Sequence, residues 1–428
     1  MNAQAQRNTT TGLRADASAA ALPPRPQSRP RRRIRVLLMD LWCFIPYYMT
    51  ELTKGLEAEN IQADLLSTTY RFEPKFFRQN EVVNNPGLLD VISKIRIPWA
   101  KLRQLLKLLE YCCNLTILVI TLPFTRPEIL HVQYLALLSR GLPLELPLLY
   151  EAKALGIKLV CTVHNLLPHD TGDRHRGVFQ RLYRMADLII CHNRATRERL
   201  IREFGVLPEV VEVIPHGPLQ QLQRNVTAEK ARESLGLPHG IPIVLWQGVI
   251  VPYKGIDFLL EAWGKVTSKA YLLIAGTGDE KLLAALRDKA AALETESTNP
   301  IRLDLRFIPP EELPNYFQAA DILVYPYKQI TTSGALMTGL GYGKAIIVSK
   351  LPTFEEMLTE GKNALMVEYG DANAFADSLN ALLENPALRT RLGMEAKALE
   401  QSKYSWKQIA SKTRDCYDTL LLPGQADC

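Results

Sequence analysis

Short apolar runs alternate with longer segments of helical periodicity from Ile34 onward. The runs are rich in Val, Ile and Leu, which is typical of parallel strands that helices cover on both faces. In the first half of the chain we expect strands at Arg35–Met39, Ala63–Leu66, Ile129–Val132, Lys158–Val163, Leu188–Cys191 and Val211–Ile214. The alternation predicts an α/β domain over residues 34–214.

The same alternation begins again after residue 240. The strands expected there are Ile243–Trp246, Tyr271–Ala275, Leu303–Phe307, Ile322–Tyr325, Ala345–Val348 and Ala364–Val367. Residues 215–240, between the two sets, contain several prolines and glycines and are interpreted as a linker. We therefore predict a second domain over residues 241–402, so that two Rossmann-like domains have parallel sheets facing each other across a cleft.

A last helix is expected within residues 403–428. Ser405 and Gln408 form a capping-box pattern, and apolar side chains follow at helical spacing. Because this apolar stripe needs a surface to pack on, we expect the helix to cross the domain boundary.

One apolar segment of the first domain permits two interpretations. Residues Lys101–Cys113 form an amphipathic pattern, and the apolar stretch Leu115–Phe124 follows directly. The stretch is shorter than the about 20 residues that span a bilayer, so a transmembrane helix is not expected. The two alternatives are a buried connecting helix and a contact with a membrane surface.

The formal net charge of +6 lies in the first 33 residues, where seven arginines face one aspartate. This segment lacks the apolar core of a secretory signal, so we expect a disordered basic tail on a cytoplasmic protein. Two alternatives are open for the arginines: a peripheral contact with anionic lipid at the inner face of a membrane, or a solvated tail without a partner. The remaining body is formally neutral, which argues against a nucleic-acid partner. Seven cysteines without a CxxC pair indicate neither a disulfide framework nor a zinc site.

Functional residues are sought after the strands, because ligands of open parallel sheets bind beyond the carboxyl ends. His164 directly follows Lys158–Val163, where its ring can donate to a sugar hydroxyl or orient a leaving phosphate. The alternative is a structural loop histidine. A metal site is disfavoured because the spacing of the nearby acidic and imidazole groups matches no specific ligand motif. Those groups are His164, His169, Asp173 and His175.

Two loops of the second domain carry groups suited to a diphosphate. Gly248 permits close backbone approach, and Lys254 lies near the start of a helix, where an anion is favoured. After the strand Ile322–Tyr325, Thr332, Ser333 and Gly334 open another helix. Taken singly, Lys254 could be a solvated surface lysine, and Thr332, Ser333 and Gly334 could simply cap a helix. The two loops together predict a phosphate cradle.

Two nucleotide motifs are missing from the sequence. No GxGxxG follows the first predicted strand, which disfavours a nicotinamide dehydrogenase. The pattern GxxxxGK[ST] of nucleoside triphosphatases does not occur either.

Five segments in order resemble the large family of retaining GT-B glycosyltransferases that includes sucrose synthase-like enzymes and bacterial polysaccharide and glycolipid transferases. They are KLVCTVHNLLPHD from Lys158, VIPHGP from Val213, QGVIVPYKGIDFLLEAW from Gln247, LLIAGTGDE from Leu272 and FIPPEELPNYFQAADILVYPY from Phe307. The resemblance implies that His164 lies near the reacting sugar, and that Gly248 and Lys254 serve the donor diphosphate.

The donor motif departs from the family pattern, which has two glutamates with seven residues between them. Aligned on Gly343, the glutamate positions hold Ile330 and Thr338, and the arginine usually found just before the lysine is also missing. The form TTSGALMTGLGYGKAIIVS resembles a branch in which Ser333 and Gly334 serve the phosphates. Thr338 is counted among the donor-binding residues.

The resemblance implies transfer of a sugar from a nucleoside diphosphate sugar to a hydroxyl acceptor, with retention. No metal cofactor is expected, because Lys254 and the helix dipole can supply the positive field. The acceptor is expected to be a saccharide or a lipid-linked saccharide of bacterial exopolysaccharide, capsule or glycolipid synthesis. Two alternatives remain open. One is a non-catalytic or partner-dependent nucleotide-sugar-binding subunit, which the missing glutamates favour, and the other is a sugar-nucleotide epimerase of the same fold.

Overall fold

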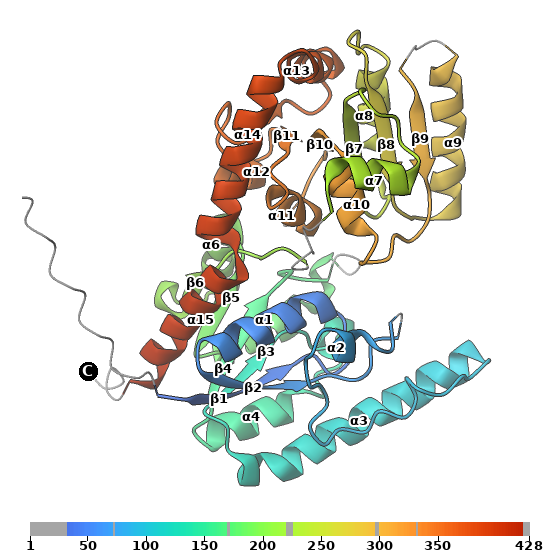
Figure 1. Ribbon diagram of the computed structural model, residues 1–428. Helices are drawn as coiled ribbons and strands as arrows, with labels where there is room; N and C mark the ends of the chain where they lie inside the picture. Colours follow the sequence, from blue (N-terminus) through green and yellow to red (C-terminus); the bar gives the residue numbers. More distant parts are fainter. Residues whose placement is uncertain are drawn as a thin grey trace, which may run out of the picture. The chain divides into compact units, whose positions relative to one another are not determined.

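A computed structural model of the protein describes residues 32–71, 73–168, 172–219, 226–295, 299–330 and 333–422. It contains two parallel sheets, each of six strands, with helices between successive strands (Figure 1). This confirms the predicted α/β class with two Rossmann-like sheets. The predicted basic tail lies outside the described residues except for Arg32 and Arg33.

The first sheet has the order β2-β1-β3-β4-β5-β6. Its strands are β1 (Ile34–Met39), β2 (Ile61–Leu66), β3 (Ile129–Val132), β4 (Lys158–Val163), β5 (Leu188–Cys191) and β6 (Val211–Val213). The helices connecting them are α1 (Pro46–Ala58), α2 (Phe76–Gln79), α3 (Ala100–Thr125), α4 (Leu146–Ala154), α5 (Arg176–Met185) and α6 (Arg194–Phe204).

The second sheet has the order β12-β11-β10-β7-β8-β9. Its strands are β7 (Ile243–Gln247), β8 (Tyr271–Ala275), β9 (Ile301–Asp304), β10 (Ile322–Tyr325), β11 (Ala345–Ser349) and β12 (Leu365–Val367). Its helices are α7 (Ala228–Leu235), α8 (Ile256–Trp263), α9 (Glu280–Glu294), α10 (Leu313–Ala319), α11 (Gly334–Leu340), α12 (Pro352–Met357), α13 (Ala372–Glu384) and α14 (Pro386–Leu399).

Both sheets are buried on both faces, as their continuous apolar strands predict. In β1, Leu37 and Met39 belong to one hydrophobic cluster, whereas Val36 and Leu38 belong to another. The alternation of side chains along a strand places these two clusters on opposite faces of the sheet. Strand β7 divides its side chains between two further clusters in the same way.

One predicted strand was placed two to three residues too far along the chain. The segment Leu303–Phe307 was expected, but β9 spans Ile301–Asp304. The chain turns after this strand, since the amide of Arg306 donates to the carbonyl of Asp304 at 3.1 Å. Two prolines follow Ile308 and cannot donate to a ladder, so Phe307 lies in the loop with 55% of its surface exposed.

The predicted linker is partly helical. Helix α7 lies within residues 215–240, and Ala231 and Leu237 are buried in a cluster of the second sheet. These two side chains join this part of the segment to the second sheet, although its prolines and glycines predicted an irregular connection.

The last helix, α15 (Trp406–Leu421), follows a one-turn π-helical segment, Glu400–Tyr404. Tyr404 is buried in a cluster of the second sheet, while Trp406 is buried in a cluster of the first. The Ser405 hydroxyl accepts from the Gln408 amide at 3.5 Å, and the indole of Trp406 donates to the Pro218 carbonyl at 2.7 Å. The helix packs against α1.

The length argument against a membrane span was wrong. Lys101–Cys113 and Leu115–Phe124 share one helical register and form a single helix, α3, of 26 residues. Among the described helices, α3 alone is long and apolar enough to cross a membrane, judged by length and composition. One face of α3 nevertheless packs into the core of the first sheet through Tyr111, Leu115, Leu118 and Leu122, beside α4 (Figure 1).

Candidate functional site

A cavity of about 360 Å³ lies beyond the carboxyl ends of β7 and β10. The strand order of the second sheet reverses between these two strands, which is where ligands of doubly wound sheets bind. The predicted donor residues that line it are Gly248, Lys254, Ser333, Gly334 and Thr338. Thr332, predicted with them, lies outside the described residues. Two separate loops of the sequence thus meet at one cavity.

Gly248 makes room for Lys254. Its φ of 149° is one that side-chain-bearing residues rarely adopt. A Cβ at this position would lie 2.9 Å from the Nζ of Lys254. Lys254 ends a short 3₁₀ turn, Pro252–Lys254, before α8. The glycine therefore allows the ammonium group to fold back against the backbone that follows β7.

The Lys254 ammonium is desolvated without a counter-charge. Burial lowers its pKa to about 8. Its Nζ lies 5.9 Å from the ring centroid of Tyr327. Within the described ranges, Lys254 forms no ion pair, and no Asp or Glu lines the cavity. A half-buried cation without a carboxylate partner is a ready binding group for an anion.

Ser333 and Gly334 also have structural roles. The Ser333 hydroxyl accepts from the Leu336 amide at 3.2 Å and caps α11. A Cβ at Gly334 would lie 2.5 Å from Cδ1 of Leu219. Helix α11 has only seven residues, so Lys254 is the principal positive group at the cavity.

The two positions that match the family's glutamates both line the cavity. Ile330 contributes an apolar side chain, and Thr338 contributes a hydroxyl that accepts from the Leu219 amide at 3.3 Å. A threonine hydroxyl that accepts one hydrogen bond still has its proton to donate. The geometry therefore keeps these positions in the site while replacing two carboxylates by neutral groups.

In the first domain, His164 lies half-buried at the end of β4 and lines a cavity of about 450 Å³. Its Nε2 lies 3.0 Å from Oε1 of Gln133, and its Nδ1 lies 3.2 Å from Nε2 of His192. Both ring nitrogens thus have protein partners. The predicted role of His164 toward the sugar remains a prediction, and a ligand would compete with one of these partners.

His164 belongs to a buried chain of hydrogen bonds that sequence reasoning missed. His131 on β3 lies 2.6 Å from the Tyr417 hydroxyl and 2.9 Å from Nε2 of Gln133. At the other end, Nδ1 of His192 lies 3.0 Å from the Ile214 carbonyl. The sequence offered one signal for these residues, which is that Gln133 and His192 each directly follow the last residue of a strand.

One arrangement of protons satisfies the whole chain with neutral rings. The Ile214 carbonyl can only accept, so His192 donates from Nδ1 and accepts at Nε2 from Nδ1–H of His164. The Nε2 of His164 must then accept, which requires the Gln133 amide to turn by 180° so that its nitrogen, in place of Oε1, faces His164. His131 donates in turn to the Gln133 oxygen. Burial favours this neutral state, lowering the pKa of His131 and His192 to about 3.

The described residues do not support the metal site that the sequence disfavoured around His164. Asp173 forms an ion pair with Arg176 at 3.2 Å, and His169 lies outside the described residues. In the described part of the chain, no group of three or more His, Cys, Asp or Glu side chains could hold a metal ion.

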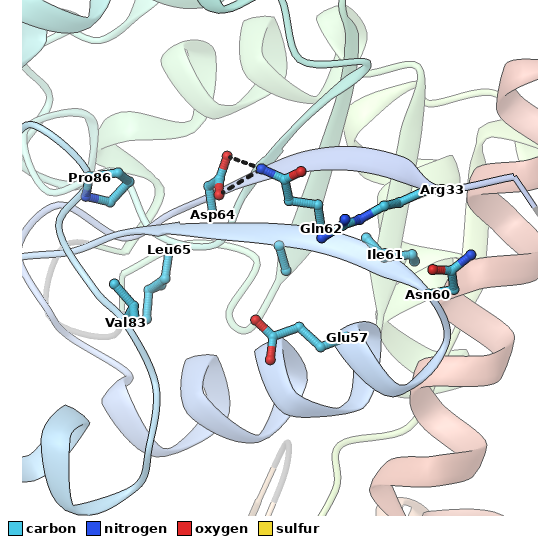
Figure 2. A pocket seen from close by; sticks show the side chains of 10 residues that line it. Arg33, Glu57, Asn60, Ile61, Gln62, Asp64, Leu65, Val83 and Pro86 are labelled. Carbon is cyan, nitrogen blue, oxygen red and sulfur yellow. Dashed lines mark hydrogen bonds between the residues drawn. The ribbon is translucent and has the colours of Figure 1, made fainter.

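A further hollow lies along β2, the edge strand of the first sheet (Figure 2). Asp64, which lines it, is already bonded within the protein, since the Gln62 amide donates to it at 3.4 Å and Arg35, outside the lining, donates to it at 3.1 Å. It does not lie at the carboxyl ends of the strands. We therefore place the candidate site at the two cavities beyond the strand ends.

Comparison with known families matches both halves of the chain. Residues 45–217 match the family described as Glycosyltransferase Family 4, and residues 241–385 match Glycosyl transferases group 1. Together the two matches cover more than half of the chain.

Curated relatives carry a related name. The chain is 27% identical over 255 residues to D-inositol 3-phosphate glycosyltransferase of Nocardioides sp., covering 56% of this chain and 55% of that protein. It is 24% identical over 296 residues to the protein of the same name in Corynebacterium diphtheriae, covering 64% and 67%. The chain thus spans between about half and two thirds of the length of these relatives.

Solved structures show the same fold. A glycosyltransferase from Rickettsia africae superposes with a TM-score of 0.69 at 15% identity, covering 92% of this chain and all of that one. HepE of Anabaena in complex with UDP-glucose superposes with a TM-score of 0.67 at 15% identity, covering 90% and all of it.

Proposed function

Since the chain belongs to the glycosyltransferases of group 1 and family 4 with the GT-B fold, we propose that it transfers a sugar from a nucleoside diphosphate sugar to a hydroxyl acceptor. The observation that carries the proposal is the desolvated Lys254 ammonium in the cavity at the strand-order reversal of the second sheet. The solved HepE structures with UDP and UDP-glucose support a nucleotide-sugar donor for this fold.

In the proposed reaction the bond between the anomeric carbon and the diphosphate oxygen breaks, and a bond to the acceptor oxygen forms. The acceptor hydroxyl loses its proton to the departing diphosphate, so charge and atoms balance. Configuration at the anomeric carbon is retained in this proposal. Negative charge grows on the diphosphate as the bond breaks, and Lys254 is the group placed to stabilise it.

The positive charge of Lys254 takes the place that a metal ion has in other phosphate sites, so we propose a metal-independent reaction. Removing a charge-assisted hydrogen bond of this kind typically costs about 1.5–3 kcal/mol. Ser333, Gly334 and Thr338 line the same cavity and would contact the donor there. The proposed setting is bacterial exopolysaccharide, capsule or glycolipid synthesis in the cytoplasm, at the inner face of the membrane.

The test is release of nucleoside diphosphate from UDP-, GDP- and ADP-sugars by the purified full-length chain in the presence of a bacterial lipid extract. We expect the wild type to release nucleoside diphosphate from one donor class. Lys254→Ala should release it at least about tenfold more slowly. Lys328→Ala is the matched control, because Lys328 lies on an exposed loop of the same domain and does not line the cavity. Equal rates for both variants would overturn the role of Lys254.

A second candidate function is a nucleotide-sugar-binding subunit that needs a partner for transfer. It is favoured by Ile330 and Thr338 at the two glutamate positions, since neither can accept from sugar hydroxyls as a carboxylate does. Binding of a sugar nucleotide without release of the diphosphate in any donor class would support this function over the transferase.

A further inference from the structure

The largest cavity described at the first sheet lies outside the donor site. It measures about 800 Å³ and begins at the loop after β1, which contributes Trp42 and Phe44. The strand order of this sheet reverses between β2 and β3 around β1, so the cavity opens at a carboxyl end where ligands of such sheets bind.

The wall of this cavity is strongly basic. It contains Arg71, Arg96, Arg103, Lys107 and Arg140 and no Asp or Glu. Among the described residues, Arg96, Arg103, Lys107 and Arg140 form no ion pair. Two buried carboxylates lie close by, but Asp90 is bonded to Thr69 and Lys94, and Glu110 accepts from two backbone amides. The cavity therefore presents several positive groups that lack an anion.

Buried polar contacts join two backbone segments that carry cations of this cavity. Glu110 on α3 accepts from the amide of Val91 at 2.6 Å, and Asn114 accepts from the amide of Leu89 at 2.7 Å. These bonds fix the segment that carries Arg96 against α3, which carries Arg103 and Lys107. The backbone positions from which Arg96, Arg103 and Lys107 extend are therefore fixed relative to one another.

Aromatic contacts orient two of these cations. The guanidinium of Arg140 lies 4.8 Å from the ring centroid of Trp42, and the Lys107 ammonium lies 5.9 Å from it. Burial lowers the pKa of Lys107. A desolvated cation beside an unpaired guanidinium favours a small anion with several oxygens, such as a phosphate.

The cavity adjoins the one that contains His164. Phe44 and Arg140 line both cavities. A ligand with its phosphate among the cations would therefore extend toward His164, where the resemblance places the reacting sugar.

Helix α3 continues from the basic cavity as an apolar surface. Its exposed face carries Leu102, Leu105, Leu109, Ile120 and Phe124 at helical spacing, while the opposite face packs into the core. Trp99, at the start of the helix, is 70% exposed. Between residues 91 and 126 the only acidic residue is the buried Glu110, against six cations. This charge and this apolar face are complementary to the surface of an anionic membrane.

We propose that the basic cavity binds the phosphate group of a lipid-linked acceptor, with α3 lying on the membrane surface. The inference rests on the proposed transferase function and names the class of its acceptor. The lipid chain would remain in the bilayer along the exposed face of α3, and the phosphate would enter between Arg103 and Arg140. The hydroxyl that accepts the sugar would then lie on the side of His164.

The test uses the full-length chain and flotation with vesicles of phosphatidylcholine alone or mixed with phosphatidylglycerol. The double variant Arg103→Gln/Arg140→Gln is expected to bind the phosphatidylglycerol vesicles about tenfold more weakly than wild type. The matched control is Arg181→Gln/Arg184→Gln, which removes the same charge from exposed positions of α5. Leu105→Ser/Ile120→Ser is expected to weaken binding to both kinds of vesicle.

Equal affinity of the two arginine double variants for phosphatidylglycerol vesicles would overturn the proposal. A second result would also overturn it: soluble glycerol 1-phosphate protects the protein against heat, this protection requires Arg103 and Arg140, and the protein does not bind vesicles. The ligand would then be a soluble phosphate ester. UDP binding serves as a separate readout. It is expected to survive in every variant of the first domain, so loss of vesicle binding can be distinguished from failure of the proposed transferase function.

Discussion

The ammonium group of Lys254 occupies space that a side chain at residue 248 would take, since a Cβ on Gly248 would lie 2.9 Å from Nζ. A glycine after the first strand of the second sheet and a lysine six residues later are thus one structural unit. The unit places a cation at the cavity where the strand order reverses.

Gly248→Ala is expected to weaken nucleotide binding by about tenfold. The added methyl group would displace the ammonium, and the φ of 149° would strain the alanine backbone. Titration calorimetry with the nucleotide that binds wild type measures the effect. Gly177→Ala is the control, because a Cβ there contacts nothing within 4 Å. Unchanged affinity of Gly248→Ala would show that Lys254 does not need this space.

Affinity for the nucleotide diphosphate is expected to fall as pH rises above 8. The pKa of Lys254 is lowered to about 8, and only the protonated ammonium attracts the diphosphate. Between pH 7 and pH 9 the dissociation constant should rise by up to about tenfold. In Lys254→Arg the guanidinium stays charged over this range, so this variant corrects for titration of the nucleotide itself. The same pH dependence in both proteins would contradict the role given to Lys254.

Ile330→Glu is expected to raise the affinity for a sugar nucleotide relative to the free nucleotide. It returns a carboxylate to a half-buried position that lines the donor cavity and can accept from sugar hydroxyls. We expect this ratio of affinities to rise several-fold, because one hydrogen bond contributes about 0.5–1.5 kcal/mol. Ile330→Gln is the neutral control. An unchanged ratio of the two affinities would show that the donor sugar does not contact residue 330.

The stability of the protein is expected to fall steeply in mild acid. Burial lowers the pKa of His131 and His192 to about 3 and that of His216 to about 4, whereas an unfolded histidine titrates near 6.5. Below about pH 6.5 the unfolded state binds more protons, so each histidine lowers the free energy of unfolding by up to about 1.4 kcal/mol per pH unit. Asp40 has the opposite effect on stability to one of these histidines. Burial raises its pKa to about 6, so at mildly acidic pH the folded state binds this proton more tightly than the unfolded state does.

Denaturant unfolding at pH 7 and at pH 5 measures this slope. His192→Gln should reduce the pH dependence by the contribution of one histidine, whatever its effect on stability at pH 7. Stability that is equal at both pH values, or a slope that His192→Gln leaves unchanged, would contradict the neutral histidine chain.

The sequence predicts most of the fold because both sheets are buried on both faces, which leaves unbroken apolar runs. The start of β9 was missed because Arg302 and Asp304 interrupt its apolar pattern, and the more apolar Leu305 and Phe307 lie in the loop. The linker prediction overlooked α7, whose single fully buried side chain, Ala231, gives almost no periodic signal. Helix α3 appeared as two segments because its amphipathic half and its apolar half differ in composition.

The candidate site could be inferred from the sequence where one loop carries a conspicuous residue type, as with Lys254 and Gly248, which line the same cavity. It was not predictable where function depends on convergence. His131 and Gln133 come from β3 and its end, and His192 follows β5, so only the sheet order brings them to His164 after β4. The basic cavity likewise combines the loop after β1 with the start of α3, which lie about sixty residues apart in the sequence.

The central claim is that the second domain binds a nucleoside diphosphate through Lys254. It is tested most directly by melting the full-length wild type, Lys254→Ala and Lys328→Ala with UDP, GDP, ADP and their sugar conjugates. A ligand at 100 times its dissociation constant stabilises the folded state by about 2.7 kcal/mol. The account predicts that one nucleotide family raises the melting temperature of wild type and Lys328→Ala but not that of Lys254→Ala. An equal rise in Lys254→Ala, or no rise with any nucleotide, would contradict it.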